Sequence, residues 1–166
     1  MSTFYREYLY HISNNNIILA TDASKSARFT SIAAHNLNTQ KGSARLIPNV
    51  NSTFTAECLA IIMAIKLHVK DNNHYIILTD GKSVAESSKL VTHKSPSVIL
   101  ELHKVLRSTL NYSLSITLIW VPGHRGIAPN EAANQLAKSV NENTEKWQIA
   151  AAEDLIVNYA HLGPGS

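Results

Sequence analysis

Cysteine is nearly absent from this chain, which has 166 residues and a single thiol at Cys58. No disulfide can therefore form within the chain, and this is typical of proteins kept in a reducing compartment. We expect an intracellular location, in the cytoplasm, the nucleus or both. Cys58 lies in an apolar run at residues 58–65, where a small core residue is a better interpretation than a reactive nucleophile.

Long hydrophobic runs are also lacking. No apolar segment approaches the ~18–20 residues that a membrane span needs, and residues 1–11 lack the apolar stretch of a signal peptide. The sequence therefore predicts a soluble protein with no membrane partner. Glycine and proline are scarce, at 6 and 5 residues, while 45% of the chain is hydrophobic, which excludes a disordered chain. We expect one domain at residues 1–162, with residues 163–166 as a linker or cloning remnant.

Neither sign of charge is in large excess. The chain carries 15 Lys and Arg against 12 Asp and Glu, for a formal net charge of +3. This mildly basic balance permits a polyanionic partner, but an ordinary solvated surface explains it equally well. The function has to be sought in the pattern of residues.

Apolar periodicity predicts three strands followed by alternating helices and strands. The polar segment at residues 38–42 is typical of a hairpin loop, and Pro96 and Asn130 suit a first helical turn and an N-cap. An antiparallel meander followed by β-α-β crossovers predicts an α/β fold, with a five-stranded mixed sheet and helices on both faces. The expected strands are 16–21, 27–36, 42–48, 75–79 and 115–120, and the expected helices are 55–69, 82–91, 96–110, 130–140 and 147–159.

Three acidic residues lie beside these apolar elements. Asp22 and Asp80 each follow an apolar strand, and Glu57 opens the most apolar helix. Taken singly, such aspartates often only form turns, and a glutamate there can simply favour the helix dipole. Taken together, they would meet at the carboxyl ends of two parallel strands, where their repulsion would favour a bound cation. Ligands with only oxygen donors favour Mg²⁺ or Mn²⁺ over zinc.

Four ordered segments carry a resemblance to a known family. They are TDASK at 21–25, TAECLA at 55–60, LTDG at 78–81 and WVPGHRG at 120–126, the last followed by NE at 130–131. Over residues 16–138 the chain resembles ribonuclease H, most closely the RNase H domains of non-LTR retrotransposon polyproteins. The resemblance implies the RNase H-like fold. It also implies an endonuclease that hydrolyses the RNA strand of RNA–DNA hybrids and leaves 5′-phosphate products.

The resemblance also implies the roles of the site residues. Asp22, Glu57 and Asp80 match three of the family's four metal-binding carboxylates, and His124 matches its mobile catalytic histidine. Asn134 stands where the family usually has the fourth acid, so its amide oxygen can bind a metal but brings no charge. We expect two Mg²⁺ ions at the scissile phosphate, with Mn²⁺ able to substitute. We also expect weaker metal binding near Asn134, with chemistry retained.

A second group of residues could contact the hybrid, although a solvated surface role fits each of them equally well. Hydroxyl groups just before the helical acid could meet a 2′-OH, and basic side chains could neutralise phosphates. Residues 92–95 leave no room for the extra basic helix with which some members grip the duplex. We therefore expect part of the affinity to come from a reverse transcriptase domain in the same polyprotein, and the isolated domain to be a monomer. The candidate contacts are Ser24, Lys25, Ser52, Thr53, Thr55, Lys82 and Arg125.

Two alternatives stay open. A degenerate RNase H-like module could bind nucleic acid or protein without cleavage, and its one support is Asn134 in place of an acid. A different nuclease or a transposase could share the fold, but the glycine-flanked loop at residues 123–126 and the NE pair after it disfavour this interpretation.

Overall fold

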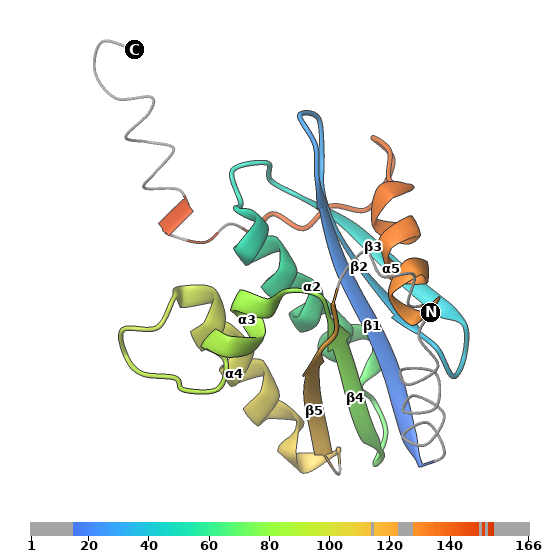
Figure 1. Cartoon of the computed structure of the whole chain (residues 1–166), viewed down its shortest axis with the longest axis vertical. Coiled ribbons are helices and arrows are strands. Elements are labelled where there is room, and N and C mark those ends of the chain that lie inside the picture. The colour runs from blue at the N-terminus through green and yellow to red at the C-terminus, as the bar shows by residue number, and fades with distance from the viewer. Residues whose placement is uncertain (1–14, 114, 123–127, 150, 152, 155–166) are drawn as a thin grey trace.

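The fold is a five-stranded mixed sheet flanked by helices, as the sequence predicts (Figure 1). The computed structural model describes residues 15–113, 115–122, 128–149, 151 and 153–154. Across the sheet the strands run in the order β3-β2-β1-β4-β5. The strands are β1 (Asn16–Lys25), β2 (Thr30–Asn36), β3 (Lys41–Ile47), β4 (His74–Thr79) and β5 (Ser115–Trp120). The helices are α2 (Thr53–His68), α3 (Lys82–Ser87), α4 (Ser97–Ser108) and α5 (Ala128–Lys138), with a short 3-10 turn at Thr109–Asn111.

Strand directions follow from the lengths of the connections. The short links between β1, β2 and β3 form antiparallel hairpins. β4 pairs in parallel with β1 and β5 pairs in parallel with β4, because each of these steps passes through helices. The carboxyl ends of β1, β4 and β5 therefore lie at the same edge of the sheet.

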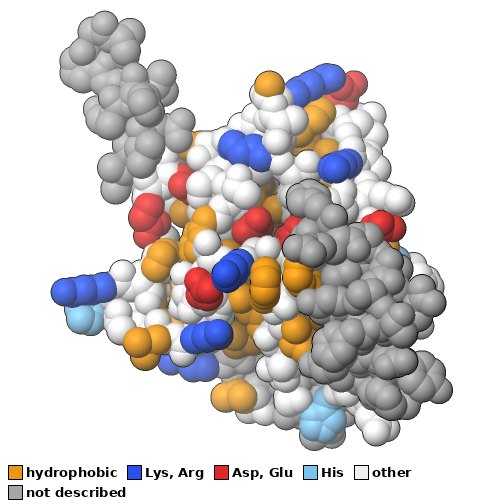
Figure 2. Space-filling view, viewed as in Figure 1, with side chains coloured by type: hydrophobic (Ala, Val, Ile, Leu, Met, Phe, Trp, Pro, Cys, Tyr) orange, Lys and Arg blue, Asp and Glu red, His pale blue; other side chains and the backbone are white. Residues whose placement is uncertain are grey.

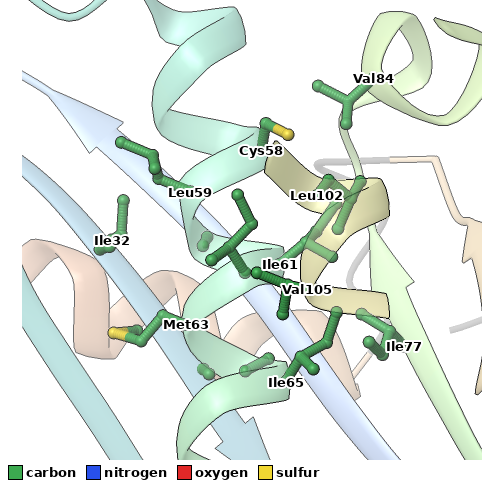
Figure 3. Packing of buried hydrophobic residues seen from close by; sticks show 14 of the residues in the cluster. Ile32, Cys58, Leu59, Ile61, Met63, Ile65, Ile77, Val84, Leu102 and Val105 are labelled. Atoms are coloured by element: carbon green, nitrogen blue, oxygen red, sulfur yellow. The ribbon is translucent and has the colours of Figure 1, made fainter. Parts of the chain in front are cut away.

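Helices cover both faces of the sheet, with α2 and α4 on one side and α5 on the other (Figure 1). The alternation of side chains along each strand supplies both cores. Leu19 and Ile77 join the larger core under α2 and α4, whereas Ile18 and Ile76 belong to a smaller cluster on the opposite face. Figure 3 shows the larger core, in which side chains of α2 meet side chains of α4 and β4.

The central helix α2 is apolar on nearly every side, because it lies between the sheet and α4. Its buried residues run almost continuously from Thr55 to Ile65. Cys58 is 0% exposed, and burial raises the pKa of its thiol to about 12, which confirms a core residue. Ser52 caps the helix by accepting a hydrogen bond from the backbone N–H of Thr55 at 3.2 Å. We expected Glu57 to open this helix. It lies past the first turn instead, because the helix begins at Thr53.

Two predicted strand boundaries differ from the structure by three residues or more, and the others agree to within one residue. β1 continues to Lys25, beyond the predicted end at residue 21, because its pairing with β2 extends to Lys25 opposite Thr30. Asp22 is consequently inside the strand rather than after it. β2 begins at Thr30 and not at residue 27, because Ser26 and Phe29 close the hairpin turn through a backbone hydrogen bond of 2.8 Å.

Several helix boundaries also differ from the predictions. α3 ends at Ser87 rather than 91, and Pro96 is the N-cap residue that precedes α4 rather than part of its first turn. α5 begins at Ala128, so Asn130 lies inside its first turn and is not the N-cap. Pro129 permits this earlier start, because the N–H groups of a first turn have no helical acceptor.

The predicted helix at residues 147–159 was wrong for residues 147–149 and 151, which are not helical, whereas residues 153–154 are helical. Leu46 of β3 accepts a hydrogen bond from Trp147 N–H at 2.8 Å and donates one to the carbonyl of Glu145 at 2.9 Å. These bonds draw the segment alongside the edge strand, where it is extended. No helix within the described ranges is long and apolar enough to cross a membrane.

Candidate active site

The parallel pairing of β1 and β4 brings two of the predicted acids to the same level of the sheet. Ala20 lies opposite Leu78, and Asp22 and Asp80 each follow two residues later. The Thr21 hydroxyl donates a 2.9 Å hydrogen bond to the carbonyl of Leu78, which ties the two strands together at this point. Asp22 is 9% exposed, whereas Asp80 is half-buried just after β4.

Helix α2 adds the third acid. A Cβ atom placed on Gly81 would lie 2.6 Å from Oε2 of Glu57 and 3.3 Å from its Cβ. The Glu57 carboxylate therefore rests against the backbone of the residue that follows Asp80. Gly81 has an ordinary φ of −75°, so a side chain is excluded there by the close approach of Glu57 and not by the backbone conformation.

Electrostatics also connect the three acids. Partial burial, followed by the negative charges of Asp80 and then Asp22, raises the pKa of Glu57 from its ordinary value of 4.5 to about 7. Without a cation, Glu57 thus keeps its proton to a higher pH than an ordinary glutamate does. Such a shift, caused by burial and by carboxylates that converge at the carboxyl edge of a sheet, is typical of a functional site.

This shift predicts how stability depends on pH in the metal-free protein. A folded-state pKa above the unfolded value means that the folded chain binds the Glu57 proton more tightly. The contribution of Glu57 is therefore most favourable below about pH 4.5 and is lost as pH rises towards about 7. We expect Glu57→Gln to gain melting temperature relative to the parent protein at pH 8 but not at pH 4.5, in buffer with a chelator.

Glu101→Gln is the matched control, because Glu101 is an exposed glutamate on α4. Its melting temperature should follow that of the parent protein at both pH values. If Glu57→Gln showed the same pH dependence as the parent, the pKa of Glu57 would not be raised in the folded protein.

The structure places Asn134 on α5, the helix that packs on β1 and β2. Asn134 is half-buried there. The Ser31 hydroxyl of β2 donates a hydrogen bond to the carbonyl of Ala137, which fixes this helix against the sheet. Asn134 therefore lies on the element that covers the strand of Asp22. His124 and Arg125 lie outside the described residues.

The predicted substrate contacts fall into two groups. Thr53 and Lys82 are exposed, and Ser24 is half-buried. Lys25, Ser52 and Thr55 already have protein partners. The Lys25 ammonium donates to the backbone carbonyls of Asn49 and Asn51, the latter at 2.7 Å, and the hydroxyls of Ser52 and Thr55 donate to Asp154. Thr55 is buried.

Asp154 accepts a hydrogen bond from the hydroxyl of Thr55, a role that no sequence motif predicted. Its Oδ2 accepts hydrogen bonds from the Thr55 hydroxyl at 2.7 Å, from the Ser52 N–H at 3.1 Å and from the Ser52 hydroxyl at 3.3 Å. Asp154 thus completes the N-terminus of α2, one turn before Glu57. No local pattern could have revealed it, because its partners lie about 100 residues earlier in the chain.

The donor chemistry of the site fits a hard divalent cation. Asp22, Glu57 and Asp80 supply carboxylate oxygens, and their mutual repulsion at Glu57 is what such a cation would relieve. Among the residues that the structure describes, no three His, Cys, Asp or Glu side chains form a group that could hold a metal ion. The fit therefore rests on donor chemistry and on electrostatic coupling.

Comparisons with known proteins agree with this fold. The family model for RNase H matches residues 14–142. Among solved structures, RNase H1 from the halophilic archaeon Halobacterium salinarum NRC-1 has the same fold, with a TM-score of 0.58 and 15% sequence identity. The match covers 74% of this chain and 95% of that one. A search of curated proteins finds no match.

Proposed function

The chain belongs to the RNase H family, and from that premise we propose that it is an endonuclease that hydrolyses the RNA strand of RNA–DNA hybrids and leaves 5′-phosphate products. The observation that carries the proposal is the meeting of three carboxylates: Asp22 and Asp80 lie at the same level of the sheet, and Glu57 of α2 rests against Gly81 beside them. A cluster of this kind is suited to binding a cation and, through it, a phosphodiester.

Divalent ions are part of the proposal. Asp22, Glu57, Asp80 and the amide oxygen of Asn134 would hold two Mg²⁺ ions, with Mn²⁺ able to substitute. Such ions supply Lewis-acid stabilisation of the phosphate and lower the pKa of a bound water. The chain itself supplies the negative charge: Asp22 is held in β1 by backbone pairing with Ala33, and Glu57 is held against Gly81.

Substrate choice tests the proposal directly. Labelled RNA–DNA hybrid, double-stranded RNA and double-stranded DNA would be incubated with the protein, with Mg²⁺, with Mn²⁺ and with a chelator. We expect cleavage of the RNA strand of the hybrid only, in the presence of either metal. Cleavage in chelator, or equal cutting of the DNA duplex, would exclude the proposed activity.

We also propose that the chain is part of a non-LTR retrotransposon polyprotein, acts inside the cell and works beside a reverse transcriptase domain. Its support is the resemblance of the WVPGHRG segment and of the NE pair after it. Residues 88–96, all of them described, connect α3 to α4 through turns, without a further helix. A neighbouring domain would then supply part of the grip on the duplex.

The second candidate function is a module that binds without cutting, and Asn134 is the observation that favours it. A Mg²⁺ titration of cleavage rate separates the two. We expect Asn134→Asp to need less Mg²⁺ for half-maximal rate than the parent, by a few-fold, because a partly solvated carboxylate adds a screened charge. Asn134→Ala should need more, because it removes the ligand oxygen.

Superimposed titration curves for the three proteins would remove Asn134 from the metal site. Asn134→Asp also addresses the non-cutting module. If the parent does not cleave but Asn134→Asp does, the site is a degenerate one whose missing charge has been restored.

A further inference from the structure

Trp120 is a large aromatic residue that ends the edge strand β5 with 41% of its surface exposed. In the parallel pairing of β4 and β5 it lies opposite Thr79, the last residue of β4. The next residue along, Val121, donates its N–H to the Thr79 carbonyl at 2.8 Å and so extends the pairing by one residue. The indole is thereby placed beside the turn that carries Asp80.

The carbonyl of Asp80 accepts two hydrogen bonds. One comes from the backbone N–H of Lys82 at 3.0 Å, within the same turn, and the other from Nε1 of Trp120 at 3.3 Å. Gly81 N–H donates to the Thr79 hydroxyl at 3.0 Å and completes the turn. The indole bond comes from another strand, so it ties the orientation of the Asp80 peptide to the sheet.

The same ring also contacts a cation. Nζ of Lys82 lies 5.5 Å from the centre of the Trp120 ring, which is within the range of a cation–π interaction. Lys82 is exposed, and a free lysine side chain in water would sample many positions. The ring therefore restricts the positions that the ammonium can occupy. In the view of Figure 2, acidic side chains lie in the middle of the molecular surface, next to Lys or Arg and exposed hydrophobic side chains.

We propose that Trp120 is a positioning residue with two effects. Its Nε1 fixes the peptide of Asp80. Its ring holds the Lys82 ammonium beside the carboxylate cluster, where the ammonium meets a backbone phosphate of the nucleic acid. This inference rests on the proposed function for the identity of the ligand. The indole contacts Asp80 through the backbone carbonyl, so Trp120 acts on the site through its neighbours.

Substitutions at Trp120 and Lys82 separate the two effects. Trp120→Phe keeps a ring but removes the N–H, so we expect kcat to fall about tenfold and Mg²⁺ affinity to weaken, as when other indirect supports of a metal site are lost. Lys82→Gln should instead raise KM for the hybrid several-fold and lower the slope of log affinity against log salt by about 1. Trp120→Leu should both lower kcat with Mg²⁺ affinity and raise KM. In the Trp120→Leu background, Lys82→Gln should raise KM by less than it does in the parent protein.

Mg²⁺ binding is measured by calorimetry on the protein without nucleic acid, so this readout does not depend on cleavage. Trp147→Phe is the matched control, because Trp147 is half-buried beside β3, away from Asp80, and should leave Mg²⁺ affinity, kcat and KM unchanged. Unchanged Mg²⁺ affinity and kcat in Trp120→Phe would overturn the positioning role. If the parent protein cut no hybrid, the proposed function would fail, and calorimetry would still decide the role of Trp120: weaker Mg²⁺ binding supports it and equal binding overturns it.

Discussion

Asp22→Asn is expected to reduce cleavage of the RNA–DNA hybrid by at least about 1,000-fold, which corresponds to about 4 kcal/mol of transition-state stabilisation. Asp22 is the most buried of the three acids, at 9% exposure, and it lies in the strand between β2 and β4. Its charge acts on Glu57, so it contributes directly to the field that a cation would meet. An amide keeps the shape of the side chain and removes that charge.

The fold of Asp22→Asn should be unchanged. The β1 backbone at this position pairs with Ala33 of β2, and that pairing does not depend on the side-chain charge. In chelator at pH 8 the melting temperature should rise, because the repulsion between Asp22 and Glu57 is relieved. A variant that loses activity while gaining metal-free stability would separate a functional charge from a structural one.

The measurement is a single-turnover cleavage rate with saturating Mg²⁺, together with a melting curve in chelator. Asp71→Asn is the matched control, because it makes the same chemical change at an exposed position. Asp71 precedes β4, so it lies near the amino ends of the parallel strands, whereas Asp22 lies near their carboxyl ends. It should cleave at the parent rate. Near-normal turnover by Asp22→Asn would refute the role assigned to that carboxylate.

The sequence predicts the framework of the site because short-range patterns determine it. Alternating apolar residues mark β5 at residues 115–120, and the structure has the same bounds. Asp22 and Asp80 follow similar apolar runs, and parallel pairing at equal register then brings them to the same level. The topology follows from connection lengths, since a hairpin needs few residues and a parallel crossover needs many.

Other features escaped prediction because they depend on long-range contacts. The segment after α5 contains residues that suit a helix, but hydrogen bonds to Leu46 hold it extended along β3. Asp154 contacts the N-terminus of α2 only because that segment then passes over it. Asn130 suits an N-cap, yet α5 begins earlier at Ala128. In each case tertiary contacts override a local preference.

Gly81→Ala is the second substitution with a large expected effect, and it tests the geometry of Glu57 rather than its charge. The added Cβ would lie 2.6 Å from Oε2 of Glu57, 3.2 Å from its Cδ and 3.3 Å from its Cβ. The Cβ of Glu57 is fixed to α2, so its flexible carboxylate has to rotate away to make room for the methyl group. The carboxylate then leaves its position against residue 81. Because a misplacement of about 1 Å at a catalytic group can cost about 100-fold in rate, we expect kcat to fall by about that factor.

Stability should change much less than rate. Gly81 has an ordinary φ, so alanine meets no backbone strain, and the loss from placing alanine at the N-cap of α3 should be about 1 kcal/mol or less. Gly42→Ala is the matched control: its Cβ would lie 2.6 Å from Cδ2 of Leu136, the flexible end of a side chain on α5. It adds the same methyl group at an equally close contact away from Glu57, so its rate should stay near that of the parent.

A double-mutant cycle shows whether Gly81 acts through Glu57. Glu57→Ala removes the side chain that the new methyl group would displace, so Gly81→Ala should cost no further activity in that background. The rates of the parent, both single variants and the double variant would be compared at saturating Mg²⁺. If the two losses multiplied, or if Gly81→Ala alone kept its full rate, the Glu57 carboxylate would not work from its place against Gly81. Gly81→Ala thus tests the position of the Glu57 carboxylate, because it leaves the charge of that side chain in place.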